Sequence, residues 1–436
     1  MAMQIIQAVN RWLFGGPVLI LLFGMHLYFT IRTKFIQRNL WKGIQLSFQG
    51  SPHKEKGDGM SAFGTLTTTL AATLGTGNII GVSTAVSLGG PGAVFWCWLT
   101  GVLGMATTYA ETNLCCRYRQ KNGEEPVGGM MYVLEKALHQ KRLAAFYSFF
   151  VCFSAYFAGC TTQSNAISET CKDIWNLPKW LVGITVALTV GLVVLQGIDW
   201  IERASMAIVP AMALLFVGGC VVYLLLHLSW LPEALSHIFR YAFSTKCAVA
   251  GGLGYSVAAA VRYGVARGLF TNEAGLGTSG IAAACGKEKV SPHEQGLISM
   301  TATFWDTVVL CALTGIVVVI FQEKHGTQIR HLSSGLLVKE AFAELPLGGM
   351  AVIGIATVAF AIATLIGWSL FGKVAAEYLG GENLMRKYQY VYVVMIFVGA
   401  VMPLGFVWEM TDFVNLFLLV PSLYTLFRCR KMLQKK

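Results

Sequence analysis

The sequence predicts an all-α membrane protein with about eleven transmembrane helices, and this prediction rests on composition and hydropathy. Hydrophobic residues make up 55% of the 436 residues and charged residues only 13%, whereas a soluble domain carries roughly 25% charged residues. Apolar stretches of about 18 or more residues, long enough to cross a bilayer core about 30 Å thick, recur along the chain. This composition excludes a soluble enzyme.

Eleven segments have the required length and polarity. The first has no small-residue cleavage site, so a retained helix is expected there instead of a removed signal peptide. We expect transmembrane helices at residues 14–31, 61–87, 93–117, 143–171, 180–198, 202–226, 249–283, 294–321, 348–376, 388–405 and 407–428.

Basic residues concentrate in alternate connections between these segments. Because cytoplasmic loops carry an excess of Lys and Arg, we expect a multi-pass protein of the plasma (cell inner) membrane with its N-terminus outside and its C-terminus in the cytoplasm. The net charge is +11, and the bases form no aromatic-interleaved patch, so nucleic acid is not an expected partner. Membrane lipid is an expected partner, and anionic lipid should contact residues 32–56. The basic connections are residues 32–56, 117–142, 287–289 and 428–436.

The last ten segments divide into two sets of five, each beginning with a glycine-broken helix. Since five is odd, the second set enters the membrane from the opposite side, as in an inverted repeat. We therefore expect one integral membrane domain over residues 1–436. It would comprise an extra helix at 14–31, a first repeat at 61–226 and an inverted second repeat at 249–428.

The first broken helix contains Gly75-Thr76-Gly77-Asn78. Glycine tolerates unwound backbone and lets a ligand approach closely. The free N–H groups where a half-helix starts attract a carboxylate, and carbonyls at the end of the preceding half-helix can coordinate Na⁺. An unwound helix survives in a membrane only where it lines a cavity or is buried in protein, so this break predicts the central site of a transporter.

The second break spans residues 268–280 and contains a G-x-G-x-x-G run at Gly275, Gly277 and Gly280. A dinucleotide site would need a preceding strand and a soluble helix, and the sequence predicts neither. We instead expect unwound backbone beside the aromatic ring of Phe270. Glu273 then either ties this loop to its neighbours or joins an ion-pair network with nearby arginines.

Two further acids, Glu111 and Asp306, lie within apolar segments. A charged group at membrane depth is a functional candidate, and either acid could carry a coupling proton. A fixed ion pair with Arg262 or Arg267 is the plainer interpretation.

The sequence lacks the motifs of other protein classes, such as metalloproteins, hydrolases and channels. The eleven cysteines lie mostly within apolar segments and include no C-x-x-C pair, so neither a metal centre nor a disulfide framework is expected. The segments offer neither the nucleophile–base pair of a hydrolase nor the rings of like charge that line a channel. We expect a carrier, not an enzyme, without an organic cofactor.

Two stretches, GTGNIIGVSTAVSLGGPGAVFWCWLTGVLGMATTYAE and RYGVARGLFTNEAGLGTSGIAAA, resemble the signatures of the alanine/glycine:cation symporter family. The similarity extends from Phe14 to about Leu426. It implies a leucine-transporter-type fold, with a 5+5 inverted repeat plus one extra helix, and Na⁺-driven uptake of alanine, glycine or D-alanine. Two alternatives stay open: a proton-coupled amino-acid carrier, and a Na⁺-coupled carrier of a larger neutral amino acid such as glutamine.

The resemblance also implies the site residues. In this family the donors of the first break hold the substrate carboxylate, and aromatic rings close a methyl-sized pocket. The implied substrate contacts are Thr76, Gly77, Asn78, Gln163, Phe270, Gly275, Thr364 and Trp368. By analogy with the fold's shared cation site, the implied sodium ligands are Ala71, Leu74, Ala363 and Thr364, although family members often carry a hydroxyl residue at the position of Ala363. A second candidate sodium site comprises Thr73, Asn78 and Thr271.

Overall fold

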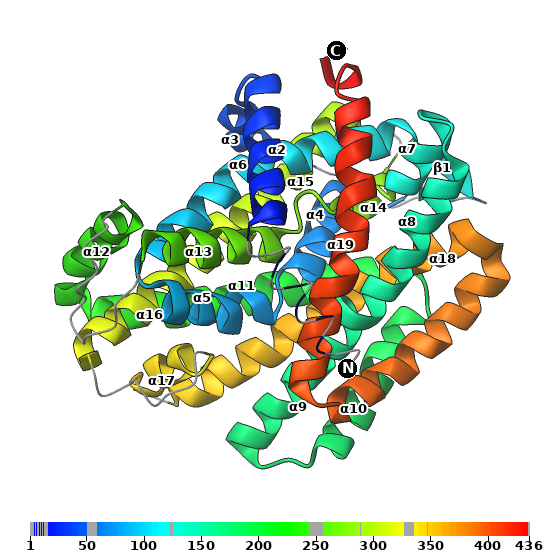
Figure 1. The fold of residues 1–436 in the computed structure, drawn as a ribbon. Helices are drawn as coiled ribbons and strands as arrows, with labels where there is room; N and C mark the ends of the chain where they lie inside the picture. Colours follow the sequence, from blue (N-terminus) through cyan, green and yellow to red (C-terminus); the bar gives the residue numbers. More distant parts are fainter. Residues whose placement is uncertain are drawn as a thin grey trace.

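The computed structural model describes residues 16–49, 59–122, 125–243, 256–287, 289–326, 335–346 and 348–434, with alternate positions from Gln4 to Trp12. Within this part of the chain nearly all regular structure is helical (Figure 1). The only strands there, β1 (Gln120–Asn122) and β2 (Glu125–Val127), form a short antiparallel pair. The prediction of an all-α protein is thus confirmed.

The first half of the chain runs from the N-terminal helix to the long helix that precedes residue 227. Its elements are α2 (Pro17–Arg32), η1 (Ile36–Asn39), α3 (Leu40–Phe48), α4 (Ala62–Thr73), η2 (Gly77–Gly81), α5 (Val82–Gly89), α6 (Gly92–Arg117), α7 (Met130–Lys136), α8 (Lys141–Ser154), η3 (Ala155–Thr161), α9 (Thr162–Trp175), α10 (Lys179–Val194) and α11 (Ile198–Leu226).

The second half repeats the order of a broken helix followed by long helices. Its elements are η4 (Leu228–Trp230), α12 (Leu231–Phe243), α13 (Val257–Asn272), α14 (Ser279–Ala284), α15 (Pro292–Thr303), η5 (Phe304–Cys311), α16 (Ala312–His325), α17 (Leu337–Ala343), α18 (Gly349–Val401), α19 (Leu404–Arg428) and η7 (Met432–Gln434).

These helices overlap all eleven predicted segments, although the first residues of segments 14–31 and 249–283 lie outside the described residues. Among the described residues, six helices are each long and apolar enough to cross a membrane, and two bent helix pairs raise this number to eight. The chain is therefore a multi-pass membrane protein, and eleven crossings remain a prediction.

Helix α18 joins two of the predicted segments, 348–376 and 388–405. Its backbone leaves helical geometry at Gly380 and Gly381, and Gly381 has a φ of +67° that favours glycine. The two expected helices thus meet at a glycine kink and not at a loop.

The broken helices lie in the middle of the molecule (Figure 1). Helix α13 packs against α5 and α6, and α18 packs against α4, α9 and η3. Small residues permit these close crossings: a Cβ atom built on Gly367 of α18 would lie 2.5 Å from the backbone nitrogen of Ala72 on α4.

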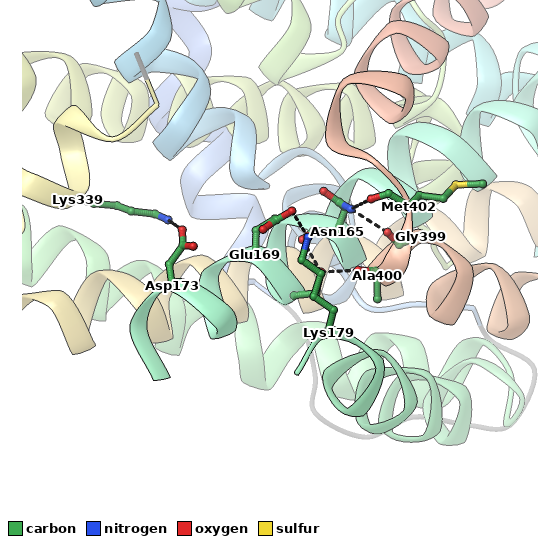
Figure 2. Close-up of polar contacts among 9 residues, drawn as sticks. Asn165, Glu169, Asp173, Lys179, Lys339, Gly399, Ala400 and Met402 are labelled. Carbon is green, nitrogen blue, oxygen red and sulfur yellow. Dashed lines mark hydrogen bonds and ion pairs between the residues drawn. The ribbon is translucent and has the colours of Figure 1, made fainter. Parts of the chain in front are cut away.

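Side chains of α9 satisfy the carbonyls at the end of α18 (Figure 2). The Asn165 amide donates to the carbonyls of Gly399 at 3.0 Å and Met402 at 2.6 Å, groups that a helix end leaves without intrahelical donors. On the same helix Asp173 pairs with Lys339 of α17 at 3.2 Å. Helix α9 therefore fixes both α17 and the far end of α18.

Candidate functional site

The first break interrupts the hydrogen bonds at the end of α4. The Gly75 N–H would ordinarily donate to the Ala71 carbonyl four residues earlier, but it donates to the Asn78 side-chain oxygen at 3.0 Å. The chain then resumes as the π-helical turn η2, and the helical segments on either side are bent by 55°. The predicted break is present, and it frees the carbonyl of Ala71.

Polar side chains from two other helices approach this break. On α9, the Gln163 side-chain oxygen accepts hydrogen bonds from the backbone N–H of Thr76 at 3.4 Å and from its hydroxyl at 3.2 Å. On α18, the Thr364 hydroxyl donates to the Leu74 carbonyl at 3.0 Å. The break therefore presents donors on one side and a group of oxygen atoms on the other.

The oxygen atoms at the end of α4 suit a hard cation. Leu74 and Thr364 bring a carbonyl and a hydroxyl together, and the Ala71 carbonyl has lost its helical donor. Ala71 and Ala363 are both buried, so protein atoms surround these oxygens. Broken helices whose unwound carbonyls coordinate Na⁺ have this arrangement, and the residues present fit the ion.

The second break follows α13. Glu273 ends the helix with a left-handed φ of +55°, and Gly275 and Gly277 have φ values of +103° and +80°. Such values are accessible to glycine without strain. Helix α14 resumes at Ser279. The glycines thus serve backbone geometry, and their match to a dinucleotide motif is accidental.

Glu111 of α6 holds this second break. Its carboxylate accepts hydrogen bonds from the N–H groups of Gly275 at 2.7 Å and Gly277 at 3.0 Å, and from the Ser279 hydroxyl at 3.2 Å. An unwound backbone in a membrane needs such internal partners, because lipid supplies none. Glu111 therefore supplies acceptors that the helix has lost.

Asp306 of η5 holds the first break in the corresponding way. Its carboxylate accepts from the Asn78 amide at 2.6 Å, and the oxygen of that amide accepts from Gly75. Each half of the chain thus clamps the broken helix of the other half: the α6 acid fixes the break after α13, and the η5 acid fixes the break after α4.

A cavity lies between the two breaks. It measures about 30 Å³, which is room for about two water molecules. Glu273 is the one ionisable side chain among the residues that line it. The lining comprises Ala72, Thr73, Gly75, Thr76, Gly77, Ala158, Thr162, Gln163, Phe270, Thr271, Glu273, Thr364, Trp368, Thr411 and Asn415.

The cavity brings together most of the residues implied by the family resemblance. Thr76, Gly77, Gln163, Phe270, Thr364 and Trp368 all line it, as do Thr73 and Thr271 of the second candidate sodium site.

Two implied substrate contacts do not line this cavity. Asn78 is fully buried, and its side chain is committed to Gly75 and Asp306. Gly275 faces Leu22 of α2, and its N–H donates to Glu111. Both residues shape the breaks from behind the cavity, and their direct contact with substrate stays a prediction.

Some lining residues were not among the expected contacts. Glu273 accepts a hydrogen bond from the Trp368 indole N–H at 3.1 Å and another from the Thr278 hydroxyl at 2.8 Å. Thr162 belongs to a run of polar residues at 161–165 in an otherwise apolar segment, a signal that could have identified it. Thr411 and Asn415 of α19 also line the cavity, and their spacing of four residues, which puts them on one helix face, is a second signal of this kind.

The expected ion pairs between membrane acids and arginines are wrong. Glu111, Glu273 and Asp306 bond to backbone amides, hydroxyls, an indole and an amide side chain within the described residues. Arg267 instead stacks over the Phe270 ring, with its guanidinium carbon 5.4 Å from the ring centroid. Backbone N–H groups of the second break satisfy Glu111, and neutral side chains satisfy Glu273 and Asp306.

The whole chain, residues 1–436, matches the model of the sodium:alanine symporter family. The sodium/alanine symporter AgcS of Methanococcus maripaludis is 37% identical over 428 residues, which are 96% of this chain and 93% of AgcS. An uncharacterized transporter of Haemophilus influenzae is 40% identical over 99% of this chain and 94% of its own length. A protein of Bacillus subtilis described as a probable sodium/glutamine symporter, GlnT, is 28% identical over 98% of this chain and 88% of its own length.

A solved structure shows the same fold. The crystal structure of MhsT in complex with L-phenylalanine superposes with a TM-score of 0.59 at 16% identity, over 85% of this chain and 88% of MhsT. The predicted all-α, leucine-transporter-like fold is therefore confirmed.

Proposed function

The chain belongs to the sodium:alanine symporter family and is a cation-coupled amino-acid symporter of the membrane. We propose that it imports the small neutral amino acids alanine, glycine and D-alanine by symport with Na⁺. One observation carries this proposal. The donors of the first break, the Gln163 amide and the Glu273 carboxylate meet at one small cavity between the two broken helices.

These groups complement the two charges of an amino acid. We assign the N–H groups at the start of η2 and the Thr76 hydroxyl to the substrate carboxylate, because the positive end of a half-helix favours an anion. The Thr76 hydroxyl would then exchange its bond to the Gln163 oxygen for one to the substrate. The oxygen of Gln163 and the carboxylate of Glu273 offer acceptors for the ammonium group. Phe270 and Trp368 line the remaining wall.

The size of the cavity supports a small side chain. Trp368 is 1% exposed and packs directly on Gly159 of η3, so little space is left beside the indole ring. Alanine, glycine and D-alanine need the least widening of these walls, whereas glutamine needs much more.

We propose Na⁺ as the coupling ion, held by the carbonyls of Ala71, Leu74 and Ala363 and the hydroxyl of Thr364. Thr73, Asn78 and Thr271 form the second candidate site, close to the Asp306 carboxylate that Asn78 contacts. This acid would add negative charge for a second ion. Proton coupling through Asp306 or Glu111 is the rival mechanism.

Transport by the purified full-length chain in liposomes tests both substrate and ion. Labelled alanine should accumulate when an inward Na⁺ gradient is imposed and should stay low with choline in place of Na⁺. Excess unlabelled glycine should compete strongly, and excess glutamine weakly. Equal uptake in choline driven by a pH gradient would refute Na⁺ coupling, and stronger competition by glutamine would refute the substrate assignment.

We further propose the two-repeat division at 61–226 and 249–428, with the N-terminus outside. The reciprocal clamps of Glu111 and Asp306 support the repeats, because related elements of the two halves perform the same task. For the orientation, α3, α7 and the C-terminus gather at one end of the molecule and α17 lies at the other (Figure 1). This separation agrees with the charge pattern.

A further inference from the structure

Three metal-ligating side chains meet away from the central cavity. Glu233 and His237 of α12 and Glu323 of α16 each offer one ligand atom, and these atoms all lie within 4.8 Å of one another. None of the three residues lines the cavity between the broken helices. The cluster is thus separate from the transport site.

The two helices place these side chains by simple geometry. Glu233 and His237 are four residues apart, so they lie on one face of α12. Glu323 belongs to the last turn of α16, against which α12 packs. The third ligand comes from 86 residues away, a proximity that spacing along the chain does not indicate.

The charge of the cluster is not balanced by lysine or arginine. The Glu323 side chain is only 4% exposed, and its carboxylate lies 2.6 Å from His237 Nδ1. Among the described residues neither Glu233 nor Glu323 has a Lys or Arg ion-pair partner. The His237 imidazole is thus the partner of the largely buried Glu323 carboxylate, and Glu233 is exposed to solvent. Two carboxylates beside one imidazole leave negative charge that a bound cation would neutralise.

A neighbouring cluster provides a contrast. Glu344 contacts His325 at 2.6 Å and His227 at 3.3 Å, but the Lys324 ammonium also lies 3.1 Å from its carboxylate. That group already contains its own permanent cation.

We propose that Glu233, His237 and Glu323 bind a divalent transition-metal ion, with Zn²⁺ as the representative ion. One imidazole nitrogen and two carboxylates form a three-ligand set that a water molecule completes to four. Imidazole suits Zn²⁺ and its neighbours in the first transition row, whereas Mg²⁺ and Ca²⁺ prefer oxygen ligands alone. Ligand bonds of about 2.0–2.1 Å require the His237–Glu323 distance to open to roughly 3.3 Å.

A bound ion would join α12 to α16. Helix α12 directly precedes the second broken helix in the chain, and α16 precedes α17, which α9 holds through Asp173. If the broken helices move during transport, α12 and α16 would then have to move together or a metal–ligand bond would have to break. Metal binding should therefore slow uptake.

Titration of the purified full-length protein with Zn²⁺ by calorimetry tests the site. The unmodified protein should bind Zn²⁺ saturably, and Glu233→Gln and His237→Asn should each weaken binding at least tenfold. Glu233 lies outside the His237–Glu323 hydrogen bond, so Glu233→Gln should leave the melting temperature unchanged. His227→Asn, in the cluster with its own lysine, is the matched control and should keep full affinity.

The same proteins in liposomes test the effect on transport. Zn²⁺ should inhibit alanine uptake by the unmodified protein and by His227→Asn at the same concentration, whereas Glu233→Gln should require at least tenfold more Zn²⁺. Absence of saturable binding, or binding that survives both Glu233→Gln and His237→Asn, would overturn the proposed site. Tight binding without inhibition would overturn the restraint on α12. Because the calorimetry needs no transport, a failed substrate assignment would not be confused with a failed metal site.

Discussion

Replacing Thr364 by valine should separate the interhelical role of its hydroxyl from its packing role. The side chain is 2% exposed, and its hydroxyl donates to the Leu74 carbonyl at 3.0 Å, with the Phe360 carbonyl of its own helix 3.1 Å away. Valine keeps the shape but leaves the buried Leu74 carbonyl without this donor. An unsatisfied buried acceptor costs about 1–3 kcal/mol, and the free energy of unfolding should fall by that amount.

The same change removes a proposed sodium ligand. If the hydroxyl contributes to Na⁺ binding about as much as a hydrogen bond to a charged group does, the variant loses about 1.5–3 kcal/mol of Na⁺ binding free energy. At about 1.4 kcal/mol per decade, this corresponds to a rise of about 10- to 100-fold in the Na⁺ concentration for half-maximal alanine uptake.

Thr357→Val is the matched control for this experiment. Thr357 lies on the same helix, is 1% exposed and donates only to the Ile353 carbonyl of that helix, at 2.7 Å. Its loss should leave the Na⁺ dependence unchanged, because that carbonyl keeps its helical N–H donor. Alanine uptake measured against Na⁺ concentration in liposomes decides the question. Identical Na⁺ curves for the two variants would refute a sodium site at Thr364.

Three further predictions follow from contacts elsewhere in the chain. Trp368→Ala should admit larger neutral amino acids while weakening alanine, as competition assays would show; leucine still excluded in this variant would mean that the indole does not limit the pocket. Gly159→Ala should lower the free energy of unfolding by about 1–3 kcal/mol, because its new Cβ would lie 2.2 Å from Trp368 Cβ. Gly218→Ala, inside α11, meets no atom within 4 Å and should cause no loss of stability. For topology, a cysteine introduced at Leu177 should react with a membrane-impermeant thiol reagent in intact cells, and one introduced at Gln45 should not. The ten native cysteines that the structure describes are buried, which lowers the background labelling. The reverse labelling pattern would invert the proposed orientation.

The sequence predicts the positions of the breaks because their causes are local. Glycine and small polar residues interrupt an apolar run at Gly75–Asn78, and the structure unwinds there. The same local signal does not say why Gly275 is a glycine, since a glycine can be required by its own φ as well as by a ligand. A break in a helix is visible in the sequence, but its purpose at each glycine is not.

The partners of the buried acids could not be predicted in this way. Glu111 bonds to Gly275 across 164 residues, and Trp368 bonds to Glu273 across 95. Nothing in the spacing of the chain indicates these pairs, and opposite charge wrongly favoured the arginines. Glu111 and Asp306 found neutral donors because the fold brings the broken helix of one half against a helix of the other half, whereas Glu273 and Trp368 belong to the same half.

The reciprocal clamps impose an order on biosynthesis. The hydrogen bond between Asn78 and Asp306 joins residues 228 positions apart, and ribosomes add roughly 5–20 residues per second. The first break must therefore wait roughly 10–50 s after its own synthesis before its clamp exists. During that interval its unwound backbone has no Asp306 to hold it, so the newly inserted first half has to keep these groups hydrated or bonded elsewhere until the second half arrives.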